Sequence, residues 1–392
     1  MVKNHPATDQ GPAPAASDLV IALSFETWDD IVRREHVRPP DRLIRHALSS
    51  GRLRRVLVAN PWRSLPRAAG RRTLGRRSAP FPTNDTARLV RPMRLRRSDP
   101  PRLDSLRVSY RAYGRRLTRE ALRAGMQAPA LLTYNPLHAA FGDHGGFRSV
   151  TYVGRDDWSA HHGHSAFAEV YQAAYDSISD RGLRVAAVSQ QIIDRISPRG
   201  PSRVVPNGVD PQVWGGPPPA QDPLEAFLRP IGVYTGTVDE RLSATALANA
   251  APHFGSILLV GPEGDDTGRR LATTLSNVHM LPSMDQTRLA ATVMAADVCL
   301  VPHVVSALTE AMSPLKVYEY LAAGRPVVAT DLPPIRHIHP SIVLSSVEQF
   351  GQNSAHALAR GPLDEDERQR FIDENSWAQR CDALLDLALS HD

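Results

Sequence analysis

Residues 313–330 carry the combination of side chains in this chain that is best suited to chemistry. The segment predicts a turn, a helix that bears Lys316 and Glu319, an end at Gly324 and then a buried strand. Free N–H groups at a helix N-terminus bind phosphate, and a nearby ammonium group strengthens that binding. Glu319 lies one turn beyond Lys316 on the same face, where a carboxylate can accept hydrogen bonds from sugar hydroxyls. The spacing predicts a site for a sugar joined to a diphosphate, although a solvated surface helix would show the same spacing.

Lys316 is the only lysine after Lys3, although Lys and Arg together number 46. Apart from these two positions, the chain uses arginine for positive charge. A lysine at the start of a helix therefore indicates that a compact ammonium group is needed there.

Two turns in the second half of the chain follow predicted strands and belong to the same sheet edge. Gly236 ends the predicted strand 231–236, and Thr237 and Arg241 in the next turn carry groups that bind phosphate. The strand 278–281 ends with Met280 and Leu281, whose backbone groups could meet the edge of a nucleobase. Ligands bind outside the carboxyl ends of strands in such sheets. An ordinary strand-to-helix turn is the alternative for residues 236–241.

Strand ends in the first half of the chain carry acids, aromatic rings and one histidine. A buried aspartate or histidine at such a position could act as a base or stabilise positive charge at a sugar carbon. We expect these side chains to lie on the rim of a cleft. The candidates are Glu26, Trp28, His138, Asp156, Asp157 and Trp158.

Three histidines, His161, His162 and His164, follow Asp156 and Asp157 closely. Such a cluster resembles a metal site, but its spacing matches no zinc pattern. The two cysteines have the sequence surroundings of small core residues and form no disulfide framework. The sequence therefore predicts no metal site and no cofactor.

The 392 residues suffice for two domains, and the formal net charge is +5. The positive charge is uneven, because arginines are dense between Arg63 and Arg123. Such a patch attracts phosphates on nucleic acid, anionic lipid or a phosphorylated acceptor. A solvated arginine-rich insert is the plainer alternative.

The first 17 residues are rich in proline and alanine and lack the apolar core of a signal peptide, which predicts a disordered tail. No apolar run approaches the roughly 18 residues that a membrane span needs. We therefore expect a cytoplasmic protein with at most a peripheral contact to the inner face of the membrane.

Short apolar runs alternate with helical patterns, which predicts an α/β fold with parallel sheets. The expected strands are 19–24, 55–60, 130–134, 149–154, 184–189, 231–236, 256–260, 278–281, 298–302, 326–329 and 342–344. The expected helices are 41–50, 106–124, 166–179, 190–196, 241–250, 268–275, 285–295, 313–323, 347–359 and one long pattern over 364–390. Residues 61–104 are rich in Arg and Pro and are expected to be irregular.

This pattern predicts two Rossmann-like doubly wound domains that face a cleft. The first, residues 18–210, carries an Arg-rich insert at about 63–104. A proline-rich linker, 211–224, leads to a second domain, 225–362. Residues 363–392 carry a C-terminal helical pattern.

Ordered motifs from about 184 to 380 resemble the GT-B glycosyltransferases, close to the large retaining family 4. They include Val205-Pro206-Asn207-Gly208-Val209-Asp210, Tyr234-Thr235-Gly236-Thr237, Leu259-Val260-Gly261-Pro262 and Pro314-Leu315-Lys316-Val317-Tyr318-Glu319-Tyr320 through Val328. The last block is the most specific, and its Pro-Leu-Lys-x-Tyr-Glu-Tyr form resembles a branch with teichuronic-acid-type transferases. For the two domains, the resemblance implies that the first domain binds an acceptor and that the C-terminal helix over 363–392 crosses back to the first domain.

The resemblance implies a nucleotide-diphosphate sugar that is bound mainly by the second domain without an essential metal. Glu319 matches the family's ribose-binding glutamate, and Lys316 with the segment Ser313, Pro314 and Leu315 matches its diphosphate end. The sequence departs from the family at Ala311, where a second glutamate usually contacts the donor sugar, and Glu310 lies beside it. Either Glu310 substitutes through a shifted loop, or recognition of the sugar differs. Of the family's usual Arg/Lys pair after the first strand of this domain, only Arg241 is recognisable.

We therefore expect a glycosyltransferase that retains anomeric configuration, with UDP as the expected nucleotide of the donor. Lys316, with help from Arg241, would stabilise the departing diphosphate. Asp157 and His138 would orient acceptor and sugar, and Asp157 would be the base if the enzyme inverts. The acceptor would be a lipid-linked saccharide or a small metabolite such as a natural product.

Other classes of protein remain as alternatives. They are a nucleotide-sugar epimerase, a non-catalytic nucleotide-sugar-binding protein on the same fold, and a nucleic-acid-binding protein that uses the arginine-rich patch. The ordered motifs account for more residues than the patch does, so no nucleic-acid partner is expected. The sequence does not indicate an oligomeric state.

Overall fold

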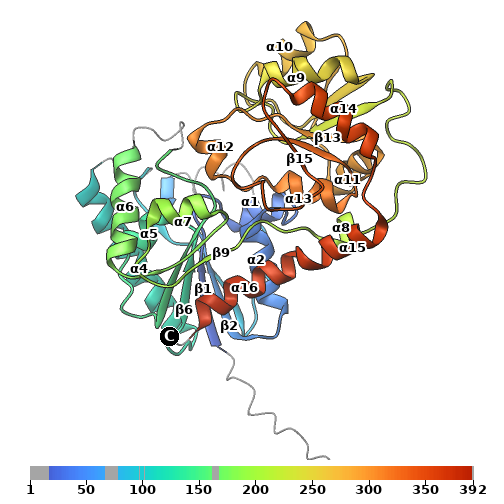
Figure 1. Ribbon diagram of the computed structural model, residues 1–392. Helices are drawn as coiled ribbons and strands as arrows, with labels where there is room; N and C mark the ends of the chain where they lie inside the picture. Colours follow the sequence, from blue (N-terminus) through green and yellow to red (C-terminus); the bar gives the residue numbers. More distant parts are fainter. Residues whose placement is uncertain (1–16, 67–77, 97, 101, 161–166, 391–392) are drawn as a thin grey trace, which may run out of the picture. The chain divides into compact units, whose positions relative to one another are not determined.

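The computed structural model describes residues 17–66, 78–96, 98–100, 102–160 and 167–390 (Figure 1). The chain divides into two compact units, one up to Val150 and the other from Thr151 to Ser390. Both are built on parallel strands with helices between them, as the sequence predicts. The expected disordered tail lies outside the described residues except for Ser17, which begins the first strand.

The first unit contains four parallel strands in the order β4-β2-β1-β6. Leu19 of β1 is fully buried, and its register partners are Val56 of β2 and Ala130 of β6. A continuous apolar run of this kind is typical of a strand that is covered on both faces. The strands are β1 (Ser17–Ala22), β2 (Leu53–Ala59), β4 (Ala87–Val90) and β6 (Ala130–Thr133).

The helices of the first unit are α1 (Trp28–Arg33), α2 (Pro39–Ser49), α4 (Leu103–Arg123) and α5 (Pro136–Phe141). The short helix α5 was not expected from the sequence. Asn135 caps it, because its side-chain oxygen accepts hydrogen bonds from the amides of Leu137 (2.9 Å) and His138 (3.1 Å). Pro136 at the first helical position supports the same start.

The expectation that residues 61–104 are irregular is wrong in part. Residues 87–90 form β4, which pairs with β2 in parallel register. Two further short strands, β3 (Arg63–Ser64) and β5 (Met93–Arg94), pair with each other. These strands are short and interrupted by arginines, so they give little periodic signal in the sequence.

The second unit begins inside β7 (Ser149–Gly154), whose neighbour is β8 (Arg184–Ala187), followed by β9 (Ser202–Val204). A separate six-stranded parallel sheet has the order β12-β11-β10-β13-β14-β15. Its strands are β10 (Ile231–Thr235), β11 (Ser256–Val260), β12 (Val278–Leu281), β13 (Val298–Val301), β14 (Val327–Thr330) and β15 (Val343–Ser345).

Side chains of the six-stranded sheet alternate between two hydrophobic cores. Val233 of β10 belongs to one core and Tyr234 to the other, and Leu258 and Leu259 of β11 divide in the same way. Successive residues of a strand point to opposite faces, so helices must cover both sides of this sheet. The sheet is therefore doubly wound, as expected from its apolar strands.

The second unit contains the helices expected up to residue 359, with small differences at their ends, and three further short helices, 211–214, 251–253 and 307–311, that the sequence did not predict. The helices of this unit are α6 (Ala168–Asp180), α7 (Gln190–Ile196), α8 (Pro211–Trp214), α9 (Ala244–Ala250), η2 (Ala251–His253), α10 (Thr267–Thr274), α11 (Gln286–Ala295), α12 (Ala307–Ala311), α13 (Leu315–Ala322), α14 (Phe350–Arg360), α15 (Glu365–Glu374) and α16 (Trp377–Leu389).

The single helix expected over 364–390 is wrong, because α15 and α16 are separate helices. The break lies at Asn375 and Ser376, where Ser376 caps α16 through the amide of Gln379. The backbone of Val209 bonds to both sides of the break, at Asn375 and Trp377 (both 2.9 Å). The helix α16 then runs along β8, and its end accepts hydrogen bonds from Arg184 at the carbonyls of Ala388 and Ser390.

Arg368 of α15 joins three segments of the second unit. Its guanidinium donates to the carbonyls of Ala322 (2.7 Å), Trp214 (2.7 Å) and Gly216 (3.0 Å), and it also pairs with Glu365 (2.7 Å). Ala322 is the last residue of α13, so Arg368 satisfies a carbonyl at the end of this helix. Arg368 thereby fixes the helix that carries Lys316.

None of the helices in the described residues combines the length and the apolar character that a membrane crossing requires.

Candidate active site

The carboxyl ends of β10 and β11 come together at two glycines. Gly236 has φ +120° and Gly261 has φ +149°, a backbone region that L side chains rarely adopt. A Cβ on Gly261 would lie 2.2 Å from the carbonyl oxygen of Gly236, so only glycine fits there. The amide of Gly236 also bonds to the carbonyl of Val260 (2.9 Å). The two turns thus form one compact backbone platform at the sheet edge.

Tyr320 fixes α13 against the end of β10. Its hydroxyl oxygen accepts a hydrogen bond from the amide of Thr235 (2.7 Å) and lies 3.1 Å from the Thr235 hydroxyl. All these groups are buried. Lys316 precedes Tyr320 by one helical turn on the same helix face, so this contact also brings Lys316 over the glycine platform.

The ammonium group of Lys316 lies where the sequence analysis expects a diphosphate. Nζ is 3.7 Å from the ring centroid of Tyr234 and 3.0 Å from the point that a Cβ on Gly236 would occupy. Burial lowers the pKa of Lys316 well below its usual range, and the charge of Arg241 lowers it further. The charges of Glu319 and Asp239 act in the opposite direction. A bound anion would stabilise the charged form of Lys316 and so raise its pKa again.

Arg241 is held by Asp239 within the same turn. Its Nε and Nη2 donate to the two carboxylate oxygens of Asp239 at 2.8 Å and 2.7 Å. The hydrogen bond to Asp239 raises the pKa of Arg241, and the charge of Asp156 adds to the rise. Thr237 contributes its carbonyl to the Tyr234 hydroxyl (3.0 Å). Because the carboxylate of Asp239 neutralises the charge of Arg241, we expect an anion to be attracted more strongly by Lys316 than by Arg241.

The segment that leads into α13 is anchored from outside the six-stranded sheet. Asn207 donates to the carbonyl of Ser313 (2.7 Å), and the Ser189 hydroxyl donates to the carbonyl of Ala311 (2.6 Å). Pro314 occupies the capping position before Leu315, and no described side chain caps α13. The amide of Val317 bonds to the carbonyl of Pro314 (3.1 Å), so the amides of Leu315 and Lys316 are those available to a ligand at this end.

The two glutamates that are candidates for the donor lie on different helices. Glu319 is buried on α13, one turn after Lys316, and its charge acts on the Lys316 ammonium. Glu310 is half-buried on α12, next to the buried Ala311, and its charge also raises the pKa of Arg336. Of the two glutamates, only Glu319 is close enough for its charge to affect the pKa of Lys316.

Met280 and Leu281 end β12 beside the glycine platform. The carbonyl of Leu281 accepts a hydrogen bond from the amide of Gly261 (3.0 Å). Met280 packs so closely against Gly268 that a Cβ there would lie 2.6 Å from its sulfur. Both residues are half-buried, so part of each remains available for contact with a nucleobase.

His303 ends a further strand at the same edge of the sheet and lies in the same cluster. His303 follows β13, is 1% exposed, and its ring centroid is 6.0 Å from that of Tyr234. Neither ring nitrogen has a hydrogen-bond partner among the described residues. Burial lowers its pKa well below the usual range, and the charges of Lys316 and Arg241 lower it further. Its place at a strand end was a signal, but its neighbours come from distant segments.

We expect His303 to make the stability of the protein depend on pH. The folded state holds this imidazole neutral, whereas the unfolded chain takes up a proton below a pH of about 6.5. Stability should therefore fall as pH drops below that value, and His303→Gln should reduce the slope by up to about 1.4 kcal/mol per pH unit. Chemical denaturation of both proteins at a series of pH values measures the difference.

The control for this prediction is His253→Gln, which removes an imidazole from an exposed position. This variant should keep the slope of the unchanged protein. Parallel pH profiles for the unchanged protein and His303→Gln would contradict the assignment of a neutral, buried His303.

The candidates in the first unit are mainly engaged in its packing. Trp28 is buried, with its indole N–H donating to the carbonyl of Pro80 (2.8 Å). Glu26 forms ion pairs with Arg34 (2.9 Å) and Arg38. His138 is fully buried on α5. Its ring contacts that of Tyr113 at 4.7 Å, and Nδ1 is 3.3 Å from the Thr133 hydroxyl.

The loop after β7 places Asp157 and Trp158 in a network within the second unit. Asp157 is 3% exposed and accepts hydrogen bonds from the amide of Ser159 (3.0 Å) and from its hydroxyl (2.5 Å). It also pairs with Arg195 (3.3 Å). The backbone amide of Trp158 donates to the Tyr175 hydroxyl (2.9 Å). These contacts order the loop and leave Asp157 few lone pairs for a substrate.

The sequence analysis predicted no metal site at the aspartates and histidines between Asp156 and His164, and the structure describes only some of these residues. His161, His162 and His164 lie outside the described residues. Within the described part of the chain, no group of three or more His, Cys, Asp or Glu side chains is arranged to hold a metal ion.

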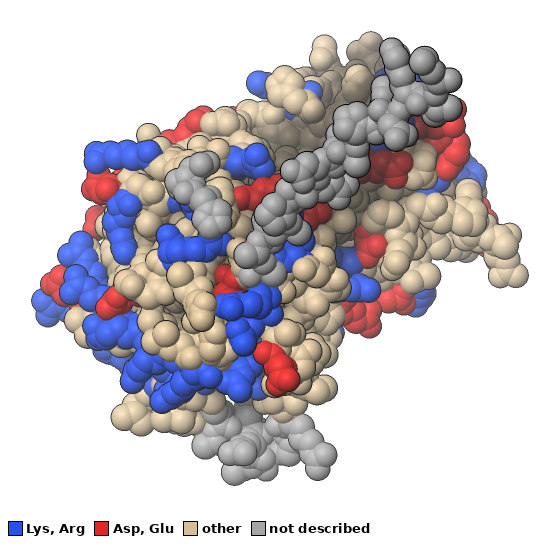
Figure 2. Space-filling model, turned by 90° about the horizontal axis from the view of Figure 1, so that it is seen from below, with Lys and Arg blue, Asp and Glu red and all other residues tan. Residues whose placement is uncertain are grey.

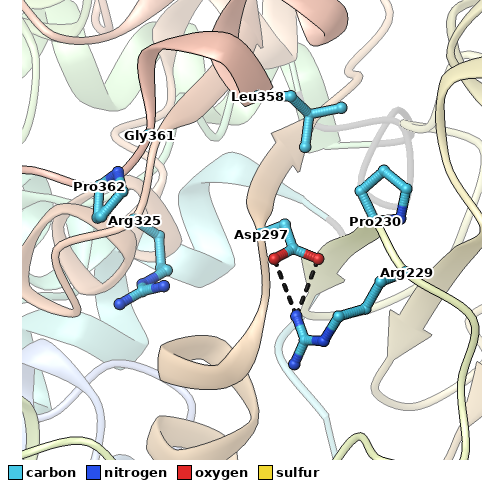
Figure 3. Close-up of a pocket in the computed structure, with 7 residues that line it drawn as sticks. All are labelled: Arg229, Pro230, Asp297, Arg325, Leu358, Gly361 and Pro362. Carbon is cyan, nitrogen blue, oxygen red and sulfur yellow. Dashed lines mark hydrogen bonds and ion pairs between the residues drawn. The ribbon is translucent and has the colours of Figure 1, made fainter.

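A pocket of about 450 Å³ lies at the amino-terminal ends of strands β10 and β13 in the six-stranded sheet (Figure 3). Its lining includes Arg229, Pro230 and Asp297, which directly precede β10 and β13. Arg229 donates to both oxygens of Asp297 at 2.9 Å, and Asp297 also accepts from the amide of Ile231 (2.6 Å). The strands therefore start from a closed ion-pair network, and the donor candidates lie at their other ends.

Two α/β units with parallel sheets define the GT-B class of fold, which the chain shares with known glycosyltransferases. Residues 229–359 match the family model described as "Glycosyl transferases group 1". The match contains every donor candidate from Gly236 to Glu319. Together, the fold and this match support the prediction of a glycosyltransferase enzyme. No curated protein sequence matches the chain significantly.

Several solved structures share the fold over nearly the whole chain. Sucrose-phosphate synthase from Thermosynechococcus elongatus has a TM-score of 0.64 and 17% identity, covering 95% of this chain and 98% of that one. A UDP-forming α,α-trehalose-phosphate synthase from Burkholderia vietnamiensis has a TM-score of 0.63 and 13% identity, covering 95% and 99%. A glycosyltransferase involved in avilamycin A biosynthesis has a TM-score of 0.58 and 13% identity, covering 95% and 99%.

Proposed function

We propose that this protein transfers a sugar from a nucleotide-diphosphate sugar to an acceptor, with retention of anomeric configuration and without a metal. One observation carries the proposal. The Lys316 ammonium lies over the Gly236 turn, beside the uncapped start of α13 and one turn before Glu319. This is the arrangement that a diphosphate and an attached ribose require.

The reaction breaks the bond between the sugar C1 and a phosphate oxygen and forms a bond from C1 to the acceptor oxygen. Negative charge accumulates on the departing diphosphate in the transition state. The Lys316 ammonium and the amides of α13 are fixed in advance where that charge develops, which is the most effective form of electrostatic catalysis. In a front-face retaining reaction, the departing phosphate oxygen takes the acceptor proton, so the protein needs no separate base.

The remaining candidates have supporting roles in this proposal. Glu319 would bind the ribose hydroxyls, and Met280 and Leu281 would lie at the nucleobase. Arg241, paired with Asp239, would strengthen the field at the diphosphate. Asp157 and His138 would position the acceptor and the sugar through the segments that they order.

The identity of donor and acceptor is a further part of the proposal. One structural relative is named as UDP-forming, which supports UDP as the nucleotide. The relatives act in sucrose-phosphate, trehalose-phosphate and avilamycin synthesis by their names, which supports a sugar phosphate or another small acceptor. A lipid-linked saccharide is the other acceptor class, and a nucleotide-sugar donor favours a cytoplasmic location. The family 4 branch suggested by the motif from Pro314 to Tyr320 is retained as a prediction.

A pair of glutamate variants tests this proposal. UDP, GDP, dTDP and ADP, and a sugar derivative of each, are first compared by thermal shift, and the best pair is titrated calorimetrically. Glu319→Gln should weaken the nucleotide and its sugar derivative alike by at least about tenfold, because a hydrogen bond to a charged group is lost. We further propose that Glu310 contacts the donor sugar in place of the glutamate that Ala311 lacks, so Glu310→Gln should weaken only the sugar derivative.

Product analysis then separates transfer from the alternatives. A transferase consumes the donor in step with an acceptor, whereas an epimerase converts the donor alone. The proposal is wrong if no nucleotide binds at millimolar concentration, or if Glu319→Gln binds the nucleotide as the unchanged protein does.

A further inference from the structure

The outer face of α4 combines arginines with exposed apolar side chains. This helix spans Leu103–Arg123, and its inner face is buried in the first unit through Leu106, Tyr110, Tyr113, Gly114, Leu117 and Ala121. A Cβ on Gly114 would lie 2.3 Å from the carbonyl oxygen of Asp143, so the helix packs closely onto the chain behind it. The opposite face is therefore presented in a fixed orientation.

Three arginines follow each other along this outer face at intervals of four residues. At 100° per residue, Arg111, Arg115 and Arg119 lie within about 80° of arc, opposite the buried side chains. Val108 and Leu122, each 66% exposed, fall within the same sector. These two apolar side chains are 14 residues apart, or about 21 Å along the helix. Along this face, two apolar side chains thus flank a run of three arginines.

Few acids balance this charge. Residues 102–123 contain seven arginines and two acids, Asp104 and Glu120. Glu120 pairs with both Arg116 (2.9 Å) and Arg123 (3.0 Å), and Arg115 is 3.8 Å from Asp143. Within the described residues, Arg111 and Arg119 have no acidic partner. Figure 2 shows one face of the molecule, on which Lys and Arg side chains gather toward one side.

The arginine-rich insert is anchored to the buried side of α4. Trp62 donates to the carbonyl of Ser109 (3.2 Å), and its ring lies 5.5 Å from that of the buried Tyr113. The hydroxyl of Tyr110, also on the buried side, bonds to Asp99 (3.0 Å). The outer face of α4 is therefore the surface considered for docking.

We propose that this surface of the first unit docks the protein on an anionic lipid membrane. Arginines attract acidic headgroups, and the exposed Val108 and Leu122 side chains gain by entering the interfacial layer. Nucleic acid fits less well, because phosphates would engage the arginines and leave the apolar side chains exposed to water. Membrane docking itself does not depend on the proposed function. Its consequence, that the acceptor is carried by a lipid, does rest on the proposed function.

Sedimentation of the full chain with lipid vesicles tests the proposal without donor or acceptor. The protein should bind vesicles of equal parts phosphatidylcholine and phosphatidylglycerol. Its binding to vesicles of phosphatidylcholine alone should be at least tenfold weaker. The triple variant Arg111→Gln, Arg115→Gln, Arg119→Gln should bind the anionic vesicles on the order of a hundredfold more weakly. The double variant Val108→Ser, Leu122→Ser should bind more weakly but keep the salt dependence of the unchanged protein.

The matched control removes three arginines from the second unit, as Arg269→Gln, Arg270→Gln, Arg288→Gln. It should bind vesicles as the unchanged protein does, and all variants should keep their nucleotide binding and melting temperature. Absence of binding to anionic vesicles would overturn the proposal, as would equal binding by the α4 triple variant. Tight, salt-sensitive binding to single-stranded RNA without vesicle binding would also overturn it. Loss of vesicle binding with intact nucleotide binding leaves the proposed transferase function standing.

Discussion

Replacing Lys316 by methionine should lower kcat by about 100- to 1,000-fold, the usual effect of removing one preorganised group that stabilises developing negative charge. Methionine keeps an unbranched side chain beside the Tyr234 ring but removes the ammonium group from the Gly236 turn. Arg241 cannot replace it, because Asp239 already holds that guanidinium with two hydrogen bonds. Initial rates at saturating donor and acceptor measure the change.

The same variant should not lose stability, which separates a catalytic from a structural lysine. Burial and Arg241 lower the pKa of Lys316, so the unfolded chain binds this proton more tightly than the folded protein does. The lysine therefore opposes folding wherever the unfolded side chain is charged, and its removal should leave the melting temperature unchanged or raise it. The exposed control Arg288→Met removes one positive charge and should change neither kcat nor stability. A normal kcat in Lys316→Met would refute the assigned role.

Replacing Arg368 by methionine should lower the free energy of unfolding by about 1–3 kcal/mol for each buried carbonyl that loses its donor. Arg368 is 6% exposed, and its guanidinium donates to the carbonyls of Ala322, Trp214 and Gly216. Without it, these oxygens lose their donor and the end of α13 is no longer fixed. Urea denaturation followed by far-ultraviolet circular dichroism measures the loss.

Arg370→Met is the matched control, because Arg370 lies on the same helix in an exposed position. It should change stability by no more than about 0.5 kcal/mol. Because the chain has two compact units, the transition of the second unit should shift while that of the first stays in place, if the two unfold separately. Equal midpoints for Arg368→Met and Arg370→Met would contradict the bridging role of Arg368.

The sequence predicted the buried strands best. The expected ranges of β7, β11 and β12 agree with the structure at both ends, because each is a short apolar run bounded by turn residues. It predicted short or interrupted elements poorly. The six residues of α5 are too few to show a helical period, and the break between α15 and α16 depends on backbone contacts with the distant Val209.

The candidate site was also predicted in part: its local motifs could be recognised from the sequence, but its contacts between distant residues could not. The motif around Lys316 and Glu319 predicted the helix that carries them, and parallel-sheet topology predicted that this helix and the Gly236 turn share one edge. The chemistry assigned to the two side chains stays a prediction. The pairing of Arg241 with Asp239 and the burial of His303 were not predictable, because they depend on side-chain packing between separate strands. In the same way, Asp157 looked like a candidate base, but Ser159 and Arg195 occupy its oxygens.

The position of Lys316 on a helix, and not on the turn after β10, has a consequence for the thermodynamics of the proposed donor binding. A lysine on a mobile turn must lose backbone freedom each time it binds a ligand. Here α13 is held by the hydrogen bond between Tyr320 and Thr235 and by Arg368 at its end, so the backbone positions of Lys316 and Glu319 keep a fixed separation. In the proposed function, donor binding should therefore carry a small entropic penalty. The fixed spacing of the proposed diphosphate and ribose contacts should disfavour donors with a shorter or longer phosphate bridge.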